Sequence, residues 1–383
     1  MTRRIQISTI VSFFVILAVP YIQEQFHIFK YAPVLEYRPK KTRPTDFRAM
    51  LSPGNPFSRK YEEYFDDTYG LRDLLIRTKN QIDYSLFHRS DTIVIGRDDW
   101  LFYKSVVEQG EVYIEMNPPD SFDRLFRRIV NLNKMLKIKG ITMVVVPLPM
   151  KNTVYPEFVP DSTARRPNPS GFQKYRAFLR QHSEIVTVDG QSILEALKTS
   201  FPVFHKTDFH WNDVAGFCVA RELMNKLGHL SGVGDAWDLP LEIKKERYKV
   251  GGENRALALL RPIKEYGLFL ESDAQPWTTG GWKETDDPNQ WEYQAKGAWA
   301  ARARIPPTAM FGDSFADAWV RASFYIFFYR LSKFNIFDFK KYLLHLPDGT
   351  RFLIMEQTET YLNNLLDDGF WPPEVSSDVS KTQ

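Results

Sequence analysis

Apolar residues first follow a helical spacing and then run without interruption between residues 120 and 148. The pattern steps by four, three and four residues through Leu125, Ile129, Leu132 and Leu136, which predicts an amphipathic helix. The stretch ITMVVVPL at 141–148 follows. Because its apolar residues are continuous rather than alternating, it predicts a strand buried on both faces, as in a parallel sheet.

Predicted helices and strands continue to alternate along most of the chain. Helices are expected at 59–87, 171–182, 191–199, 213–227 and 315–331 and in a last segment ending near 366, and strands at 185–188, 334–339, 351–355 and in short pieces within 93–103. Such alternation predicts an α/β fold, a doubly wound parallel sheet flanked by helices. Residues 229–300 break the rhythm with glycines, acidic residues and tryptophans, and we expect an irregular insertion there.

The amino terminus is apolar enough to cross a membrane. Residues 5–22 carry no charge, and at about 1.5 Å per residue they suffice to span a bilayer. No small-residue cleavage site follows, which favours an uncleaved signal anchor at 1–25. Arg3 and Arg4 favour a cytoplasmic amino terminus, although Lys30, Arg38, Lys40 and Lys41 weaken the contrast.

The remaining boundaries follow from composition. Residues 26–58 are rich in proline and basic side chains and are expected to form a stalk. The main domain is predicted at 59–366 and a flexible tail at 367–383. Lys+Arg 50 against Asp+Glu 47 is too balanced for a nucleic-acid binder that acts through a basic field. Cys218 is the single cysteine, which excludes an intrachain disulfide and a cysteine-based zinc cluster.

Asp208 and His210 form a candidate catalytic pair in the sequence KTDFHWND at 206–213. In an extended segment, side chains two residues apart emerge on the same side. A purely structural interpretation is that Asp208, Asn212 or Asp213 caps the next helix and that His210 is a half-buried polar residue. The pair becomes catalytic only if a nucleophile lies nearby.

Ser314 is the candidate nucleophile. In MFGDSFADAW at 310–319, a short apolar strand runs into Gly312 and the serine follows at the turn that opens a helix. Ligands bind at the carboxyl ends of strands in doubly wound sheets, and a helix amino terminus offers N–H groups to an oxyanion. Gly-Asp-Ser alone is weak, since any serine-capped turn has these letters. Together with the Asp-x-His pair it supplies nucleophile, base and orienting carboxylate.

These motifs resemble the SGNH hydrolase-like domain of the alginate O-acetyltransferase family. The similarity rests on GDSF with an upstream TDFHWN, and on FDDTYGLRDLL at 65–75, IGRDDWLFY at 95–103 and VVPLPMKNTVYPEFVP at 145–160. It implies that Ser314 is the nucleophile, His210 the general base and Asp208 the carboxylate that orients it. The Asp-His pair precedes the serine here, whereas ordinary SGNH hydrolases place it after.

The resemblance also implies a function and a location. The expected reaction is ping-pong transfer of an acetyl group, through a serine ester, to hydroxyls of a bacterial exopolysaccharide such as alginate, with neither metal nor dissolved cofactor. The domain is expected in the periplasm, anchored in the inner membrane. Because acetyl-coenzyme A is cytoplasmic, an integral partner of the membrane-bound O-acyltransferase type is expected to deliver the acetyl group.

Four further residues are weaker site candidates. Asn152 follows the buried strand and is a candidate oxyanion donor, though it is equally well a turn residue. Lys151 and Arg321 are candidates for binding an acidic sugar, with solvated surface charge as the simpler interpretation. Trp282 lies in the tryptophan-rich segment and is a candidate for stacking on a sugar ring. Two alternatives stay open: an acetylesterase with the same triad, and a catalytically silent polysaccharide-binding scaffold.

Overall fold

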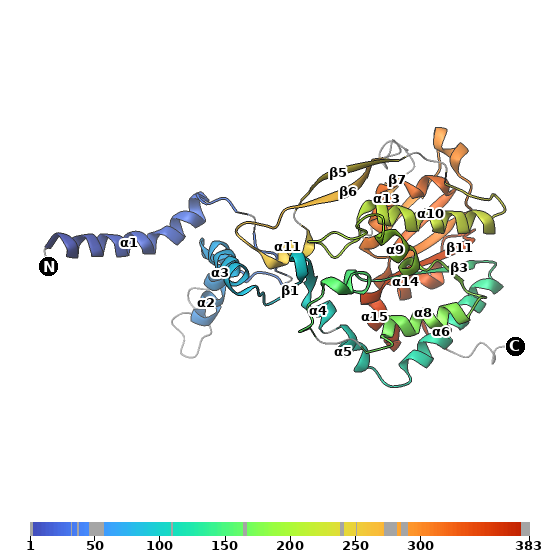
Figure 1. Ribbon diagram of the computed structural model, residues 1–383, viewed down its shortest axis with the longest axis horizontal. Coiled ribbons are helices and arrows are strands. Elements are labelled where there is room, and N and C mark those ends of the chain that lie inside the picture. Colours follow the sequence, from blue (N-terminus) through green and yellow to red (C-terminus); the bar gives the residue numbers. More distant parts are fainter. Residues whose placement is uncertain are drawn as a thin grey trace. The chain divides into compact units, whose positions relative to one another are not determined.

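The computed structural model describes residues 3–31, 33–36, 38–45, 57–108, 110–163, 167–237, 241–249, 251–271, 282–284 and 290–376 (Figure 1). The chain forms two compact units. The first comprises Met1–Ile93 and Gly252–Ile263, and the second comprises Val94–Gly251 and Lys264–Gln383. The predicted boundary at residue 59 therefore differs from the division in the structure, which falls at residue 93.

The first unit consists of helices and extended connections. Its helices are α1 (Arg3–Phe26), α2 (Phe57–Thr68), α3 (Arg72–Phe87) and α11 (Gly252–Leu257). Among the residues described, α1 is the one helix that is long and apolar enough to cross a membrane, with a mean hydropathy of 2.1 over its most apolar window. An amino-terminal apolar helix compatible with a membrane anchor is thus present.

The predicted stalk is attached to these helices rather than free. Arg38 donates to both carboxylate oxygens of Asp67 on α2, at 2.8 and 2.6 Å. This hydrogen bonding holds the pKa of Asp67 well below its ordinary value. Glu36 pairs with Arg72 on α3 at 2.5 Å. The stalk expected over 26–58 stays a prediction, with ion pairs holding part of its described residues against helices of the same unit.

A seven-stranded sheet forms the centre of the second unit, in the order β4-β3-β11-β9-β10-β8-β7. Its strands are β3 (Thr142–Leu148), β4 (Val186–Thr187), β7 (Trp282–Glu284), β8 (Gln290–Gln294), β9 (Thr308–Gly312), β10 (Arg330–Asn335) and β11 (Phe352–Thr358). Strands β4, β3, β11, β9 and β10 run parallel, whereas β8 is antiparallel to β10 and β7 to β8. This sheet confirms the predicted α/β class.

Successive residues of the central strands pack on opposite faces. Val144, Val146 and Met310 belong to one apolar cluster, whereas Val145 and Phe311 belong to another. This alternation is the period of two that a strand imposes. Because both faces are buried, β3 is a nearly continuous apolar run, TMVVVPL.

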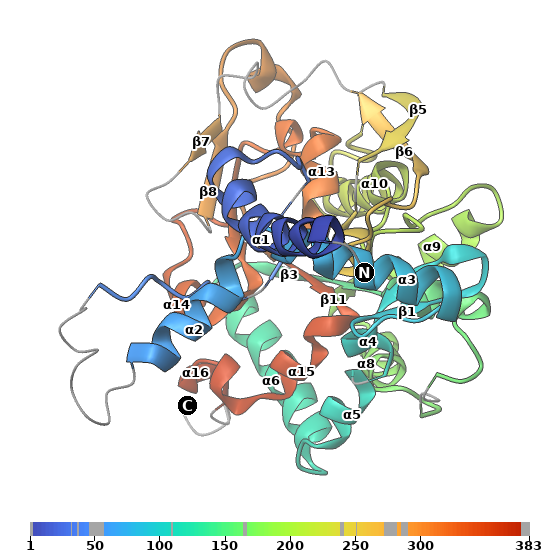
Figure 2. The same ribbon diagram turned by 90° about the vertical axis from the view of Figure 1, so that its left-hand side faces the viewer.

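Helices cover both faces of this sheet, as Figure 2 shows for α6 and α8 on one side of β3 and β11 and for α10 and α13 on the other. One group is α9 (Gly190–Lys198), α10 (Asp213–Leu230) and α13 (Asp317–Arg321); the other is α6 (Ser121–Ile138), α8 (Gly171–Gln181), α15 (Leu362–Leu366) and α16 (Pro373–Ser376). The fold also includes four short helices, α4 (Lys104–Val107), α5 (Gly110–Glu115), α7 (Lys151–Val154) and α14 (Phe339–Tyr342). Two short strands, β1 (Ile93–Ile95) and β2 (Leu101–Tyr103), pair with each other.

The segment predicted to be an irregular insertion contains four strands among its described residues. A hairpin of β5 (Glu242–Tyr248) and β6 (Glu265–Glu271) forms a separate two-stranded sheet. Strands β7 and β8 extend the central sheet instead. Residues 229–300 are therefore largely part of the fold where the structure describes them, and the expectation of irregularity is corrected.

Two further predictions differ from the structure. The helix expected over 315–331 is broken, because Ser323 adopts a φ of 62° and the aromatic residues after it form a buried turn before β10. Part of the tail expected at 367–383 is packed in the core, since Trp371 is 2% exposed and Val375 is 1% exposed.

Candidate active site

Ser314 lies in the turn that follows β9. Gly312, at the end of this buried strand, has no room for a side chain: a Cβ atom there would lie 2.7 Å from Oε2 of Glu356. The Oδ1 atom of Asp313 accepts a hydrogen bond from the N–H of Phe315 at 2.7 Å, which closes the turn. Ser314 is exposed, whereas Asp313 and Phe315 on either side are buried. The turn therefore presents the serine hydroxyl to solvent.

Hydrogen bonds to buried carboxyl groups stabilise this turn. The N–H of Asp313 donates to Oε2 of Glu356 on β11 at 2.7 Å, and Thr358 donates to Oδ2 of Asp313 at 2.8 Å. Burial, together with the charge of Asp313, raises the pKa of Glu356 well above its ordinary value. Two backbone N–H groups of the turn are thus occupied by carboxyl groups, which corrects the expectation of a freely available helix terminus. At this turn the N–H of Ser314 is the remaining oxyanion candidate.

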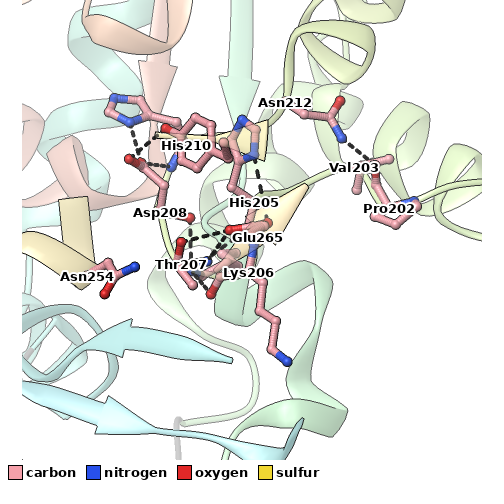
Figure 3. Close-up of polar contacts among 12 residues, drawn as sticks. Pro202, Val203, His205, Lys206, Thr207, Asp208, His210, Asn212, Asn254 and Glu265 are labelled. Atoms are coloured by element: carbon pink, nitrogen blue, oxygen red, sulfur yellow. Dashed lines mark hydrogen bonds and ion pairs between the residues drawn. The ribbon is translucent and has the colours of Figure 1, made fainter. Parts of the chain in front are cut away.

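Asp208, His210 and Ser314 form one line of hydrogen-bonding groups. The Nδ1 atom of His210 lies 2.7 Å from Oδ1 of Asp208, and its Nε2 atom lies 2.8 Å from Oγ of Ser314. The His210 backbone N–H also donates to Oδ1 of Asp208, at 2.9 Å. Figure 3 shows the Asp208 carboxylate beside the His210 ring. The structure thus brings Ser314 next to His210, which lies 104 positions earlier in the sequence.

Exposure increases along this line toward the serine. The side chain of Asp208 is 8% exposed and that of His210 is 28% exposed, and Ser314 is open to solvent. A buried carboxylate next to a half-buried imidazole and an exposed hydroxyl is the gradient expected of an orienting acid, a base and a nucleophile. The purely structural alternative for Asp208 does not apply, because Asn212 caps α10 by accepting from the N–H of Ala215 at 2.9 Å.

An indole joins the segment that carries His210 to the one that carries Ser314. Trp211 Nε1 donates to the carbonyl oxygen of Phe315 at 3.0 Å. The Phe315 ring lies 5.3 Å from the rings of both His210 and Trp211, measured between centroids. Trp211 and Phe315 flank the proposed base and nucleophile in sequence, so their contact fixes the spacing between the two. Both residues lie in the quoted motifs, but no sequence pattern points to this contact.

The structure places Lys151 away from solvent. The residue is 1% exposed, and its Nζ atom donates to the backbone carbonyls of His205, Lys206 and Asp208 at 3.3, 3.3 and 2.9 Å. The prediction that Lys151 binds an acidic sugar is corrected, because its charge is used to hold the segment that carries Asp208.

The other candidate binding residues lie in different settings. Arg321 on α13 pairs with the buried Asp213 at 2.8 Å while its own side chain stays 52% exposed. Asn152 is buried on α7, directly after β3. Trp282 pairs through its backbone with Tyr293, and its side chain lies outside the described part of the structure. The roles proposed for these three residues stay predictions. Burial raises the pKa of the Cys218 thiol, which is unfavourable for a nucleophile.

Two residues near the pair were missed by sequence analysis. Tyr248 donates from its hydroxyl to Oδ2 of Asp208 at 2.9 Å. Glu265 accepts from the backbone N–H and the hydroxyl of Thr207, at 2.9 and 2.7 Å, and Figure 3 shows its carboxylate beside Lys206 and Thr207. Both lie in the segment that was expected to be irregular, where no apolar periodicity points to them.

Comparison with known proteins agrees with this fold and motif arrangement. Residues 93–318 match the family model described as SGNH hydrolase-like domain, acetyltransferase AlgX. The chain is 26% identical over 167 residues to a probable alginate O-acetylase AlgJ of Pseudomonas aeruginosa, covering 43% of this chain and 40% of that protein. It is 24% identical over 196 residues to the protein of the same name from Pseudomonas syringae pv. tomato, covering 50% and 46%. The matches thus span less than half of these relatives.

A solved structure shares the fold. The O-acetyltransferase domain of Pseudomonas putida AlgJ superposes with a TM-score of 0.50 at 18% identity, covering 74% of this chain and 96% of that domain. Because the family model spans more than half of the 383 residues, the chain belongs to the family of the SGNH hydrolase-like domain of the acetyltransferase AlgX.

Proposed function

We propose that this protein is an O-acetyltransferase that moves an acetyl group, through an ester on Ser314, to a hydroxyl of a bacterial exopolysaccharide. The observation that carries the proposal is the position of His210, whose two ring nitrogens lie 2.7 Å from the Asp208 carboxylate and 2.8 Å from the exposed Ser314 hydroxyl. Family membership and the names of the relatives, probable alginate O-acetylases, support acetyl transfer as the reaction.

In the first half-reaction, Ser314 takes the acetyl group. Nε2 of His210 removes the hydroxyl proton while Oγ bonds to the carbonyl carbon of the donor, and the proton then passes to the donor's leaving group. Asp208 accepts from Nδ1–H, so that the unprotonated Nε2 faces the serine, and its charge stabilises the imidazolium that forms. The product is an acetyl ester on Oγ.

In the second half-reaction, the acceptor hydroxyl attacks the acetyl ester, and His210 again acts as the base. His210 removes the proton of a sugar hydroxyl, whose oxygen attacks the ester carbon, and the proton returns to Oγ as Ser314 is released. The exposure of Ser314 suits an acceptor that belongs to a long polymer. An oxyanion donor stabilises each tetrahedral intermediate by about 3 kcal/mol; Ser314 N–H and Asn152 are our candidates.

The supply of acetyl groups requires a partner if the domain lies outside the inner membrane. We propose that α1 anchors the chain in that membrane and that the folded part of the protein lies in the periplasm. Acetyl-coenzyme A is cytoplasmic, so a membrane-bound O-acyltransferase is proposed to pass the acetyl group across. The first unit contains α1 and the ion-paired segment after it. Because it includes the proposed membrane anchor, we propose that this unit contacts such a partner.

The proposal is tested with a chromogenic acetyl ester, with and without an acidic oligosaccharide acceptor. We expect chromophore release in both cases and acetylated oligosaccharide, seen by mass spectrometry, when the acceptor is present. Ser314→Ala should abolish both. Free acetate as the sole product with the acceptor present would instead identify an acetylesterase, which shares the triad and differs only in using water.

A silent binding scaffold makes the opposite prediction. Acetylation of the polysaccharide in cells would then survive Ser314→Ala and fail on replacement of Trp291, the tryptophan of β8 whose ring lies 5.9 Å from Nζ of Lys333. We expect the reverse, because Ser314 is exposed and hydrogen-bonded to a base, whereas Trp291 is partly covered by its neighbours.

A further inference from the structure

The β5–β6 hairpin reaches the Asp208–His210 segment through two residues that face each other. Tyr248 is the last residue of β5 and Glu265 the first of β6, and the two are register partners. Directly opposed residues of an antiparallel pair project from the same face. Tyr248 donates to Oδ2 of Asp208 at 2.9 Å, and Glu265 accepts from Thr207 N–H at 2.9 Å. One face of the hairpin thus contacts two adjacent residues of the segment.

The hairpin also fits around His205, five residues before His210. The rings of His205 and Tyr248 are stacked, with centroids 3.9 Å apart and planes 9° apart. Gly267 on β6 has no space for a side chain, since a Cβ atom there would lie 2.7 Å from Cε1 of His205. The orientation of the Tyr248 ring is therefore fixed by packing, and its hydroxyl is directed by that packing at Asp208.

The hydrogen bonds of the Asp208 carboxylate are divided between its two oxygens. Oδ1 accepts from the N–H and from Nδ1–H of His210, and Oδ2 accepts from Tyr248. We propose that Tyr248 is a positioning residue for the proposed acyl transfer: it fixes the rotation of the Asp208 carboxylate so that Oδ1 stays aligned with His210, and it draws negative charge toward Oδ2. This inference rests on the proposed function of the triad.

Removing the hydroxyl of Tyr248 should strengthen the pull of Asp208 on the imidazolium. A carboxylate that loses a donor at Oδ2 carries more negative charge at Oδ1, and an opposite charge nearby favours the protonated form of histidine. His210 should then stay protonated to higher pH. Burial and the charge of Asp208 raise the pKa of Tyr248 itself, so that it acts as a neutral phenol donor throughout the working range.

Other charged or titratable groups surround the pair and stay in place in this experiment. They are Lys151 on α7, His205 in the same segment, Glu265 on β6, Asp313 after β9, and Arg321 on α13. None of them is changed by replacing Tyr248 with phenylalanine, which keeps the ring stacked on His205. The measured shift therefore reports the hydroxyl alone.

The test uses the full chain in detergent and compares Tyr248→Phe with Tyr266→Phe, a tyrosine of the same hairpin that is 66% exposed. The titration of the His210 ring is followed by NMR, its signal being the one lost in His210→Gln. We expect Tyr248→Phe to displace this titration to higher pH, together with the acid limb of kcat/KM for a chromogenic acetyl ester. The value of kcat should fall about tenfold, as for loss of one charged hydrogen bond, and KM should change little.

The inference is overturned if the titration is unmoved in Tyr248→Phe, or if Tyr266→Phe moves it equally. Should Tyr248→Phe fail to fold, fluorotyrosine at position 248 decides the question, since its more acidic hydroxyl is a stronger donor and should displace the titration to lower pH. Failure of the proposed function has a different signature. The NMR titration would still shift, but acetyl ester turnover would be absent or would survive Ser314→Ala.

Discussion

The Nζ atom of Lys151 lies 2.9 Å from the backbone carbonyl oxygen of Asp208, and the carbonyls of His205 and Lys206 lie 3.3 Å away. The same ammonium group is 5.2 Å from the centroid of the Phe102 ring. A buried cation is stable only where oxygens and aromatic faces replace water. The segment that carries Asp208, the proposed orienting carboxylate, therefore surrounds the ammonium group of a lysine that begins α7.

Lys151→Met should destabilise the protein and slow catalysis without weakening substrate binding. Methionine has a similar length but no donors, so buried carbonyl oxygens lose their partner, at an expected total cost of about 3 kcal/mol in the free energy of unfolding. Chemical denaturation of the full chain measures this cost, and kinetics should show a lower kcat with KM nearly unchanged. Lys245→Met, at an exposed position of β5, is the matched control. A raised KM for an acidic glycan at undiminished stability would restore the sugar-binding role.

Glu356→Gln should make the protein more stable at neutral pH relative to the wild type. The pKa of Glu356 is raised by burial and by Asp313, so the native carboxyl is protonated where the unfolded one is charged. The contribution of Glu356 to the free energy of unfolding is therefore complete below pH 4.5, the ordinary pKa of the group, and is lost as the pH rises above that value. Glutamine stays neutral and still accepts from the N–H of Asp313. Denaturation between pH 4 and pH 8 should therefore give a flatter curve for the variant.

The activity of two Glu356 variants provides a control for this interpretation. Glu356→Gln should keep near wild-type turnover, because the turn that holds Ser314 keeps its acceptor. Glu356→Ala removes the acceptor and leaves a cavity, so both kcat and stability should fall. Equal activity in the two variants would show that the hydrogen bond at 2.7 Å does not position the turn.

His205 should make the protein less stable as the solution becomes mildly acidic. Burial lowers its pKa to about 4 from 6.5. Between these pH values the histidine is protonated in the unfolded chain but neutral in the native chain. Its contribution is complete above 6.5 and is lost as pH falls toward 4, amounting to about 3 kcal/mol. His205→Phe keeps a ring against Tyr248 and should flatten this part of the curve. An equally steep fall of stability between pH 6.5 and pH 4 in His205→Phe would contradict this assignment.

The core of the fold and the three central residues were predictable because their signals are local. Strand β3 is a continuous apolar run, and the predicted 141–148 differs from the observed Thr142–Leu148 by one residue. Asp208 and His210 are two positions apart, and Ser314 follows an apolar strand with glycine at its end. Parallel strands that share a carboxyl edge bring such motifs together whatever their separation in sequence.

The surroundings of Asp208, His210 and Ser314 depend on long-range strand pairing, so they could not be predicted from the sequence. Strand β5 reads EIKKERY and is exposed over most of its length, so it has no apolar alternation, and the contact of Tyr248 with Asp208 arises only when β5 pairs with β6. In the sequence, Lys151 has the features of a surface charge. Its burial arises only when the backbone of residues 205–208 packs against its ammonium group. The residues after Ser323 are continuously apolar, a pattern that does not distinguish a helix from a buried turn.

Asp208→Asn should slow the reaction while the proposed nucleophile, Ser314, stays in place. The amide keeps the shape of the side chain, but it must accept from the N–H and Nδ1–H of His210 with one oxygen while its NH₂ group meets the Tyr248 hydroxyl. Tyrosine can accept as well as donate, so the fold should persist. The negative charge that stabilises the imidazolium is lost, and kcat for a chromogenic acetyl ester should fall by about 10³ to 10⁴. Mass spectrometry of the trapped acetyl enzyme should show slow formation of the Ser314 ester, which is absent in Ser314→Ala. Undiminished turnover in Asp208→Asn would mean that the carboxylate 2.7 Å from His210 has no part in the reaction.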